Sequence, residues 1–467
     1  MLSPSAHTLR ALSPRAVSIN PEQPKPGLRR CLGPLAVTAQ AVGTVGLTLT
    51  AVINIPQVAA GAGHSTALCY AAAFVVILLV SETLVLFQHQ NPGADGIAGY
   101  VQLSFGRRLG QLGSWILLLG YGATLVACLA FLGFYLSRLL LQLGLPLAPG
   151  SCVLLGGLLC LELARRDVRL STRTMLVTET ISVLIVLGLC LQVLQHGGVR
   201  ADLAALNPAG DTIAQLRSGL MAAVLSFIGF ESAATLGAES LQPQRAVPQA
   251  LRQAVLLAGA VFLIWAVVLS EGLSWLAPQQ RSGLDPVSLL ADQLGQGGAG
   301  NLIKLGALLC LLGTCIGCLT ALGRVTFALA EQRVLPAALA MVHPRFRTPD
   351  VALWSLGLPS VLLASGAVAS GMGSSTLYNQ FGSFSVLGFL LIYGLVAAGS
   401  LVRPIVGISR KRRLLVGGAA LIALTALSGA FLSGLISSQQ PLVLLFVLLL
   451  GAGAALVLRS PADQAPV

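Results

Sequence analysis

SFIGFESAATLGAE, at Ser226–Glu239, lies inside a long apolar run that begins near Leu216. Gly229 and the carboxylate of Glu231 interrupt this run at the depth of the membrane centre. An ionised glutamate there costs about 2.5–3.5 kcal/mol, so it needs a partner, a proton or a water-filled cavity. Gly229 lets the backbone leave helical geometry cheaply, and freed backbone groups must line a cavity or be buried in protein. The stretch predicts a discontinuous helix at a transporter site. The alternative is a packing glycine beside an ion-paired glutamate.

The composition is typical of a polytopic membrane protein. Of the 467 residues, 55% are hydrophobic and 9% are charged, whereas soluble domains are about 25% charged. Many apolar stretches of about 20 residues recur, and each of these is long enough to cross about 30 Å of hydrocarbon as a helix. We predict spans near residues 35–60, 65–89, 112–141, 149–163, 174–195, 213–241, 249–276, 300–331, 351–371, 376–402, 414–436 and 440–458. The segment 90–111 is expected along the inner surface, and 284–294 as a short external helix.

Positive charges alternate from loop to loop along the chain. With the N-terminus inside, 23 of the 28 Lys and Arg residues fall on the inner side. The outer side has Arg138, Arg200, Arg217, Arg281 and Lys304. Because cytoplasmic loops carry the excess of Lys and Arg, both termini are predicted to be cytoplasmic. The net charge of +12 is therefore assigned to orientation in the lipid bilayer, and no nucleic-acid partner is expected.

Cysteine and histidine show no pattern of a chemical site. The nine cysteines are scattered, mostly in apolar runs, which predicts small buried side chains without a disulfide framework. Cys315 and Cys318 have CxxC spacing but no second pair, and the five histidines lack ligand spacing. We expect no metal, no cofactor and no catalytic cluster, so a membrane enzyme is disfavoured.

A second interruption is predicted in the first span. The residues that indicate it are Gly43, Thr44, Gly46, Thr48 and Thr50, followed by Pro56. Interrupted spans one and six would open two halves of five spans each, and matching interruptions point to a transporter site. Small-residue helix packing is the alternative for the first span.

Three separated motifs resemble the amino acid–polyamine–organocation (APC) permeases. FIGFES at Phe227–Ser232, with AESLQPQRAVPQA at Ala238–Ala250, resembles the sixth-helix signature. SETL at Ser81–Leu84, with NPGADGIAGYVQLSFG at Asn91–Gly106, resembles the exit of the second helix and its loop. GRVTFALAEQRVLPAALAMVHPRFRTP at Gly323–Pro349 resembles the exit of the eighth helix.

The chain departs from the family pattern in two places. The G-S-G-like motif of the first helix is absent, and Leu49-Thr50-Ala51 occupies its place when counted back from Pro56. The usual R-D-G after the eighth helix is Glu331-Gln332-Arg333. The first departure affects the substrate contacts, and the second affects only an inner loop.

The resemblance implies an all-α polytopic membrane protein with twelve transmembrane helices. Its fold would be a five-plus-five inverted repeat (LeuT-like) with helices one and six broken. Residues 1–34 would form a disordered basic cytoplasmic tail, 35–402 a ten-helix transport core, and 403–467 two accessory helices and a short cytoplasmic tail. The implied function is secondary transport of amino acids across the cell membrane by alternating access. An amino-acid/polyamine exchanger and a non-transporting amino-acid sensor of the same fold stay open.

Elementary electrostatics suggests how an amino acid would bind. Free N–H groups and a positive dipole end at the start of the inner half of the first helix favour a carboxylate. Carbonyls that end the outer half of the sixth helix accept from an ammonium. The substrate-binding candidates are Gly43, Gly46, Thr48, Thr50, Ala51, Phe227, Ile228, Gly229 and Phe230, with Phe227 or Phe230 as a gate. Tyr121 and Tyr378 are further polar candidates, with interfacial packing as their alternative.

The spans expected around the substrate side chain predict a neutral or apolar substrate. They offer Tyr121, Phe227, Cys315, Thr320, Phe381, Ser383 and Ser385. Glu231 is the one carboxylate among them that could meet a cationic side chain.

The start of the fifth helix bears on ion coupling. RLSTRTM at Arg169–Met175 resembles a stretch in which sodium-independent relatives place a basic residue between the first and eighth helices. Arg173 matches that position, which predicts transport without sodium; an ordinary inner-loop charge is the alternative. Because arginine stays protonated, any transported proton would need a carboxylate. Glu231 is the first candidate, followed by Glu82 and Glu239.

Overall fold

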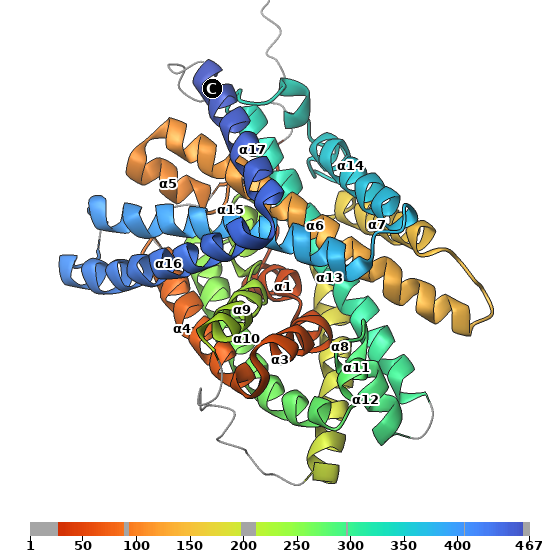
Figure 1. Ribbon diagram of the computed structural model, residues 1–467. Coiled ribbons are helices and arrows are strands. Elements are labelled where there is room, and N and C mark those ends of the chain that lie inside the picture. The colour runs from red at the N-terminus through yellow and green to blue at the C-terminus, as the bar shows by residue number, and fades with distance from the viewer. Residues whose placement is uncertain (1–26, 88–92, 198–211, 296–297, 406, 461–467) are drawn as a thin grey trace, which may run out of the picture.

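The computed structural model describes residues 27–87, 93–197, 212–295, 298–405 and 407–460, which are drawn in colour in Figure 1. These residues are helical apart from turns, connections and one isolated parallel bridge between Leu32 and Ser240. Helices suit a bilayer because they satisfy every backbone hydrogen bond within the segment.

Eleven helical spans among the described residues are long and apolar enough to cross a membrane. They are Pro34–Ala62 (α1, α2, η1 and α3), Thr66–Val85 (α4), Arg107–Gln142 (α6), Val168–Gly197 (α8), Ile213–Glu239 (α9 and η4), Pro243–Ser274 (α10), Ala299–Glu331 (α13), Asp350–Ala369 (α14), Ser374–Val402 (α15), Arg410–Ser438 (α16) and Gln440–Arg459 (α17). The 17-residue α7, Pro149–Arg165, lies between α6 and α8 and completes the twelve predicted spans.

Shorter helices occupy the connections. They are η2 (Gly63–Ser65), α5 (Ala98–Phe105), α11 (Pro278–Arg281), α12 (Pro286–Leu294) and η5 (Ala337–Ala340). The helix predicted at 284–294 is therefore present as α12. Part of the predicted inner-surface segment 90–111 forms α5, and its first residues lie outside the described part of the chain.

Helix pairing follows the five-plus-five repeat. The first, second, third and fourth spans each pack against the span five places later: α1 on η4, α4 on α10, α6 on α13 and α7 on α14. Spans one, two, six and seven form one group, and spans three, four, eight and nine form another. α8 joins the groups by packing on both α1 and α13.

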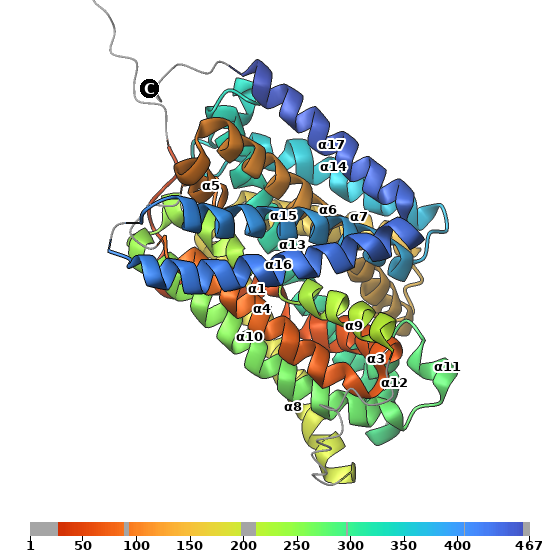
Figure 2. The same ribbon diagram turned by 60° about the vertical axis from the view of Figure 1, so that its left-hand side comes forward.

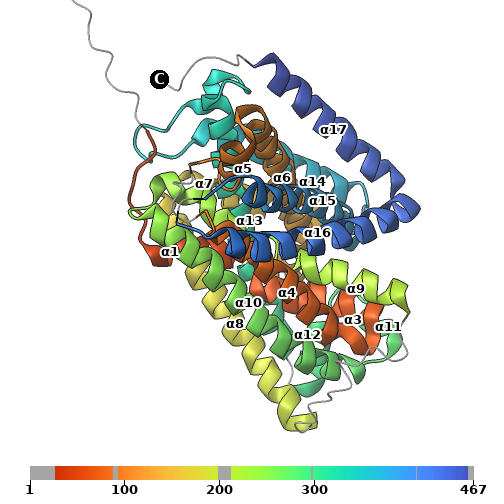
Figure 3. The same cartoon turned by 90° about the vertical axis from the view of Figure 1, so that its left-hand side faces the viewer.

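The last two spans lie at the edge of this body. α16 packs on α15 and α4, while α17 contacts α6, α15 and α16. Figure 2 shows α16 running across the face of the bundle, and Figure 3 shows α17 along its outer margin.

The surface of the spans is apolar, as a bilayer requires. Leu184, Ile422 and Leu448 are 62%, 74% and 69% exposed, respectively. Contiguous exposed leucine and isoleucine would be unfavourable in water. Together with the spans themselves, these side chains identify a multi-pass membrane protein.

Candidate functional site

The first span breaks at Gly46. α1 (Pro34–Val45) ends there, and α2 (Leu47–Leu49) begins directly after it. Gly46 has φ +68° and ψ +76°, a left-handed conformation that favours glycine. A Cβ at this position would lie 2.5 Å from Thr314 Oγ1, so close packing also requires glycine.

Two expectations for this span were wrong. Thr50 and Ala51 do not sit at the break: they lie in η1 (Thr50–Asn54), a π-helix that continues into α3 (Ile55–Ala62). The half that starts at the break, where the first N–H groups have no partner within the helix, is Leu47–Ala62. This is the later half along the chain, which is the outer half when the N-terminus is inside.

The sixth span breaks at Gly229, as predicted. α9 (Ile213–Leu225) ends shortly before it, and η4 (Phe230–Glu239) follows as a 3-10 helix. Gly229 has φ +115°, which side-chain-bearing residues rarely adopt. This interruption is the counterpart of Gly46 in the second half of the repeat.

The two breaks touch each other. A Cβ added at Gly229 would lie 2.8 Å from both the carbonyl carbon and the oxygen of Thr44. The Ser232 hydroxyl donates to Thr44 Oγ1 at 3.0 Å. Backbone of span six therefore approaches backbone of span one where both leave helical geometry.

A cavity of about 20 Å³ lies beside this contact. It is lined by Thr44, Val45, Leu49, Thr124, Ala127, Cys128, Leu225, Ile228, Thr314, Tyr378 and Gly382. The lining contains hydroxyl groups and apolar side chains but no ionisable acid or base apart from Cys128 and Tyr378. Such a volume holds about one water molecule, so the described conformation is closed around its centre.

Glu231 is held by neutral donors. Its Oε1 accepts from the Tyr121 hydroxyl at 2.9 Å, and its Oε2 accepts from the Tyr393 hydroxyl at 2.6 Å and the Gly229 N–H at 3.1 Å. The side chain is fully buried. The two tyrosine donors fix the unwound segment to α6 and α15, and the Gly229 N–H holds the carboxyl group within the segment.

The two predicted gate residues are not part of the cavity lining. Phe227 stacks on Phe74 with ring centroids 6.3 Å apart and meets Phe262 edge-on at 5.0 Å. Phe230 packs against Tyr393 at 5.9 Å. Ile228 does line the cavity. The Tyr378 hydroxyl donates to Asn54 Oδ1 at 2.8 Å and thereby braces the first span.

The expected cation of the fifth helix is not between helices one and eight. Arg173 is exposed on α8, which corrects its assignment. Met175 takes the interior position: its Cε would lie 2.9 Å from a Cβ at Gly43 and 2.7 Å from one at Gly317. Residues two apart on a helix face different sides, so Met175 points inward where Arg173 points outward.

Glu179 lies one turn further along the buried face of α8. Its Oε1 accepts the Leu47 N–H at 2.6 Å, directly beyond the break at Gly46. Thr48 Oγ1 donates to Ser182 Oγ at 3.0 Å. Two side chains of α8 therefore hold the first turn of α2.

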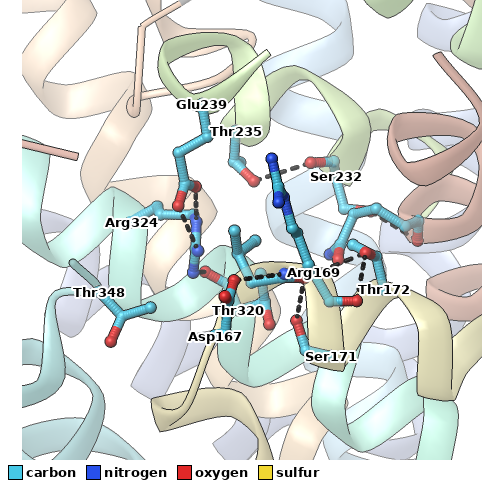
Figure 4. Close-up of polar contacts among 12 residues, drawn as sticks. Asp167, Arg169, Ser171, Thr172, Ser232, Thr235, Glu239, Thr320, Arg324 and Thr348 are labelled. Carbon is cyan, nitrogen blue, oxygen red and sulfur yellow. Dashed lines mark hydrogen bonds and ion pairs between the residues drawn. The ribbon is translucent and has the colours of Figure 1, made fainter. Parts of the chain in front are cut away.

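The other two coupling candidates are paired with arginines. Glu239 and Arg324 form a buried ion pair, Nε to Oε2 at 2.5 Å and Nη2 to Oε1 at 3.0 Å, with side chains 1% and 0% exposed. Figure 4 shows these two side chains pointing toward each other. Glu82 accepts from Arg252 at 2.6 and 2.9 Å, and Arg412 lies 3.9 Å away.

The segment before α1 closes over the end of η4. The Cys31 and Leu32 N–H groups both donate to the Glu239 carbonyl oxygen, at 2.8 and 3.0 Å. The Leu241 N–H returns a bond to the Leu32 carbonyl at 2.9 Å. Arg169 Nη2 donates to the Cys31 carbonyl at 3.3 Å. These contacts join the segment before α1 to the end of η4 and to α8. They therefore close the end of the bundle on the side of the predicted inner half of span one.

Five residues of the site were missed by sequence reasoning: Met175, Glu179, Thr314, Arg324 and Tyr393. Glu179 carried a signal, because it is a carboxylate inside an apolar span, which is the property that singled out Glu231. The other four gain their meaning only from contacts between distant segments.

Known proteins match most of the chain. The family profile described as amino acid permease matches residues 37–451. An uncharacterized transporter of Mycobacterium tuberculosis is 27% identical over 411 residues, covering 87% of this chain and 86% of that protein. The methylthioribose transporter of Bacillus subtilis is 25% identical over 406 residues, 82% of each chain. The serine/threonine exchanger of B. subtilis is 25% identical over 333 residues, 70% and 74% of the two chains.

Proposed function

The chain belongs to the amino acid permease family of the APC superfamily, and from this premise we propose that it carries neutral or apolar amino acids by alternating access. The family and the relatives are transporters and not enzymes, as predicted. The observation that carries the proposal is the meeting of the two broken spans at one cavity whose lining has no formal charge.

The cavity chemistry supports a substrate with a neutral side chain. Thr44, Thr124 and Thr314 offer hydroxyl groups, and Ala127, Leu225 and Ile228 offer apolar contacts. Glu231 could meet a cationic side chain, but its oxygens are engaged by two tyrosines and a backbone N–H. The serine/threonine exchanger among the relatives agrees with a neutral substrate.

Helix ends support recognition of the zwitterion. The N–H groups that begin α2 and the positive end of the helix dipole favour a carboxylate. α9 ends at Leu225, beside the cavity, and the negative end of its dipole favours an ammonium. The two charges of an amino acid would thus be matched by backbone groups at the two breaks.

The small cavity supports movement of one helix group against the other. A space of about 20 Å³ cannot hold an amino acid, so spans one and six must separate from spans three, eight and ten to admit one. The contacts of Cys31, Leu32 and Arg324 with Glu239 would then act as the gate on the inner side. Opening that gate breaks a buried ion pair, which favours the closed state until substrate binds.

Packing between spans one and eight supports transport without sodium, although for a different reason from the one the sequence suggested. The Met175 methyl group lies between Gly43 and Gly317. Thr314 Oγ1 donates to the Gly43 carbonyl at 3.1 Å, and Gln40 Nε2 donates to the Gly317 carbonyl at 3.0 Å. Hard cations need several oxygen ligands, and here two of the carbonyls already accept protein donors beside an apolar thioether.

The division of the chain follows from the same proposal. Residues 35–402 would be the transport core, and 403–467 would add the peripheral α16 and α17. Residues 1–34 would form the cytoplasmic tail; most of them lie outside the described part of the chain. The charge distribution supports placement in the cell membrane with both termini cytoplasmic.

The test is uptake by purified protein in sealed vesicles. Radiolabelled leucine, valine, methionine, serine, threonine, arginine and putrescine are offered in sodium-free buffer, with and without an imposed pH gradient. Accumulation of a neutral amino acid is expected. Uptake restricted to arginine or putrescine contradicts the substrate class, and a strict sodium requirement contradicts the argument from Met175. Binding without flux supports a sensor, and flux only into preloaded vesicles identifies an exchanger.

A further inference from the structure

The amides that begin the outer half of span one are already occupied by protein groups. The Leu47 N–H donates to Glu179 Oε1 at 2.6 Å, the Thr48 N–H faces the same carboxyl group, and the Leu49 N–H donates to Cys310 Sγ at 3.2 Å. Leu47–Ala62 continues from here as one helical segment through α2, η1 and α3. A substrate carboxylate that uses these amides must therefore share them with Glu179.

The cavity borders the residues on either side of this position. Val45 and Leu49, on either side of Leu47, line it together with Thr44 and Thr314. Gly46, between α1 and α2, packs against Thr314. A carboxylate that moved from the cavity to the Leu47 N–H would approach the Glu179 carboxyl group, because Glu179 accepts from that N–H.

Glu179 lacks a compensating charge. Glu179 is only 4% exposed. Its Oε2 accepts no hydrogen bond of normal geometry. It makes no ion pair with any described residue. An isolated charge at this depth is costly. Two carboxylates at one site cannot both stay ionised without a cation or a proton.

The neighbouring elements bring no cation to it. α1 and α2 contain no ionisable side chain, and on α13 the group that faces Glu179 is the Cys310 thiol. The ionisable residues on the other elements packed against α8 have different partners or lie toward helix ends: Cys152, Cys160, Glu162 and Arg165 on α7, Arg245, Arg252 and Glu271 on α10, and Asp292 on α12. A proton is therefore the available counter-charge.

We propose that Glu179 is the proton-binding residue of this carrier, and that a substrate carboxylate binds at the start of α2 together with one proton. The proton adds to Glu179, and the hydroxyl group so formed donates to a substrate carboxylate oxygen. The zwitterion and the proton enter, so one positive charge moves with each substrate. This inference rests on the proposed amino-acid substrate and adds the coupling ion and its site.

The proposal fixes the pH dependence of binding. Where free Glu179 is ionised, each substrate bound takes up one proton, so the affinity falls about tenfold for each unit rise in pH. Glu179→Gln keeps an oxygen that can accept from Leu47 but cannot titrate. Its affinity should therefore be independent of pH, and its binding should take up no proton.

The experiment is calorimetry of the purified carrier with the neutral amino acid that it binds most tightly. Titrations in phosphate and in Tris, whose ionisation enthalpies differ, are repeated at rising pH until free Glu179 is ionised, and they give the number of protons taken up at each pH. We expect about one proton in the wild type and none in Glu179→Gln. Glu162→Gln is the matched control, because Glu162 lies at the end of α7 with Arg165 and Arg166, and it should behave as the wild type.

A ligand-side measurement decides the matter even if Glu179→Gln does not fold. The wild type is titrated with the amine that remains when the chosen amino acid loses its carboxyl group, such as isoamylamine for leucine. The amine should bind without proton uptake or fail to bind. Proton uptake with the amine overturns the proposal, as does amino-acid binding without proton uptake, or unchanged uptake in a folded Glu179→Gln. Failure of every neutral amino acid to bind refutes the proposed function itself.

Discussion

Gly229→Ala tests the contact between the two broken spans with the smallest side chain available. The added Cβ would lie 2.8 Å from the Thr44 carbonyl carbon and oxygen, whereas ordinary contact begins near 3.4 Å. Backbone cannot rotate away as a flexible side chain can, so spans one and six would have to part by about half an ångström. Alanine at φ +115° adds backbone strain of about 1–3 kcal/mol.

The steric contact acts only while the breaks touch, and the backbone strain acts only while residue 229 keeps this φ. Both therefore select against the arrangement in which spans one and six meet at their breaks, which is the arrangement that forms the proposed site. A penalty of about 1–3 kcal/mol corresponds to a 5- to 150-fold loss of the population in which the two breaks meet. We expect substrate affinity to fall by about that factor and the melting temperature to drop. Gly229→Leu should abolish binding.

The matched control is Gly188→Ala on α8. A Cβ there meets nothing within 4 Å, and alanine is the better helix former by about 0.5–1 kcal/mol. This variant should keep wild-type affinity and melt at the same or a slightly higher temperature. The assays are equilibrium binding of the radiolabelled amino acid and thermal unfolding followed by tryptophan fluorescence. Wild-type affinity and melting temperature in Gly229→Ala would refute the argument.

Further predictions concern topology, a buried ion pair and a loop carboxylate. All nine native cysteines are buried, so an impermeant thiol reagent outside the cell should label Ser438→Cys and not Ser409→Cys; the reverse pattern inverts the orientation. Arg324→Met should lower the free energy of unfolding by about 3–5 kcal/mol, because it leaves Glu239 buried and unpaired. Adding Glu239→Met should recover much of this loss, and a double variant no more stable than the single one contradicts the pairing. Burial raises the pKa of Asp95 to about 6, so folding stability falls as the pH rises through that value. Asp95→Asn should therefore raise the melting temperature more above that pKa than below it, and a pH-independent difference would contradict this.

The order and number of spans could be predicted because they depend on local properties. Apolar runs of about 20 residues must cross the bilayer, and the alternation of arginine and lysine fixes which loops share a side. The largest errors were at span starts such as Val168 and Pro243, six residues before the predicted starts at 174 and 249. A helix begins or ends there according to contacts with its neighbours.

The position of the first break could not be derived from residue types alone. Gly43 and Gly46 both permit a break, but Gly43 stays helical because Met175 packs against it. Gly46 takes the left-handed conformation and fits against Thr314. Counting back from Pro56 placed the break at Leu49–Ala51, three to five residues too late, and these residues instead lie in α2 and the π-helix η1.

The assignment of Arg173 to the interior of the fifth helix was wrong because it placed the wrong face of the helix toward the bundle. Arg173 and Met175 are two residues apart, so a shift of two in the alignment exchanges the outer and inner faces of the helix. Sequence resemblance at the level of a short motif does not resolve such a shift. The expectation about sodium survives as a proposal, but it now depends on the Met175 thioether filling the space between spans one and eight.

The expected depth in the membrane is a poor guide to which buried carboxylate binds a proton. The hydrogen-bond and ion-pair partners of each carboxylate determine how much its protonation would cost. Protonating Glu239 or Glu82 would leave an arginine without its counter-charge, since arginine stays charged. Protonating Glu231 would require Tyr121 or Tyr393 to turn its donor away from the carboxyl group. A protonated Glu179 keeps its Leu47 bond, because the carbonyl oxygen of a carboxylic acid still accepts, and its Oε2 is free to carry the proton. The proton therefore disturbs the structure least at Glu179, which is also the carboxylate at the proposed binding position of the substrate carboxylate.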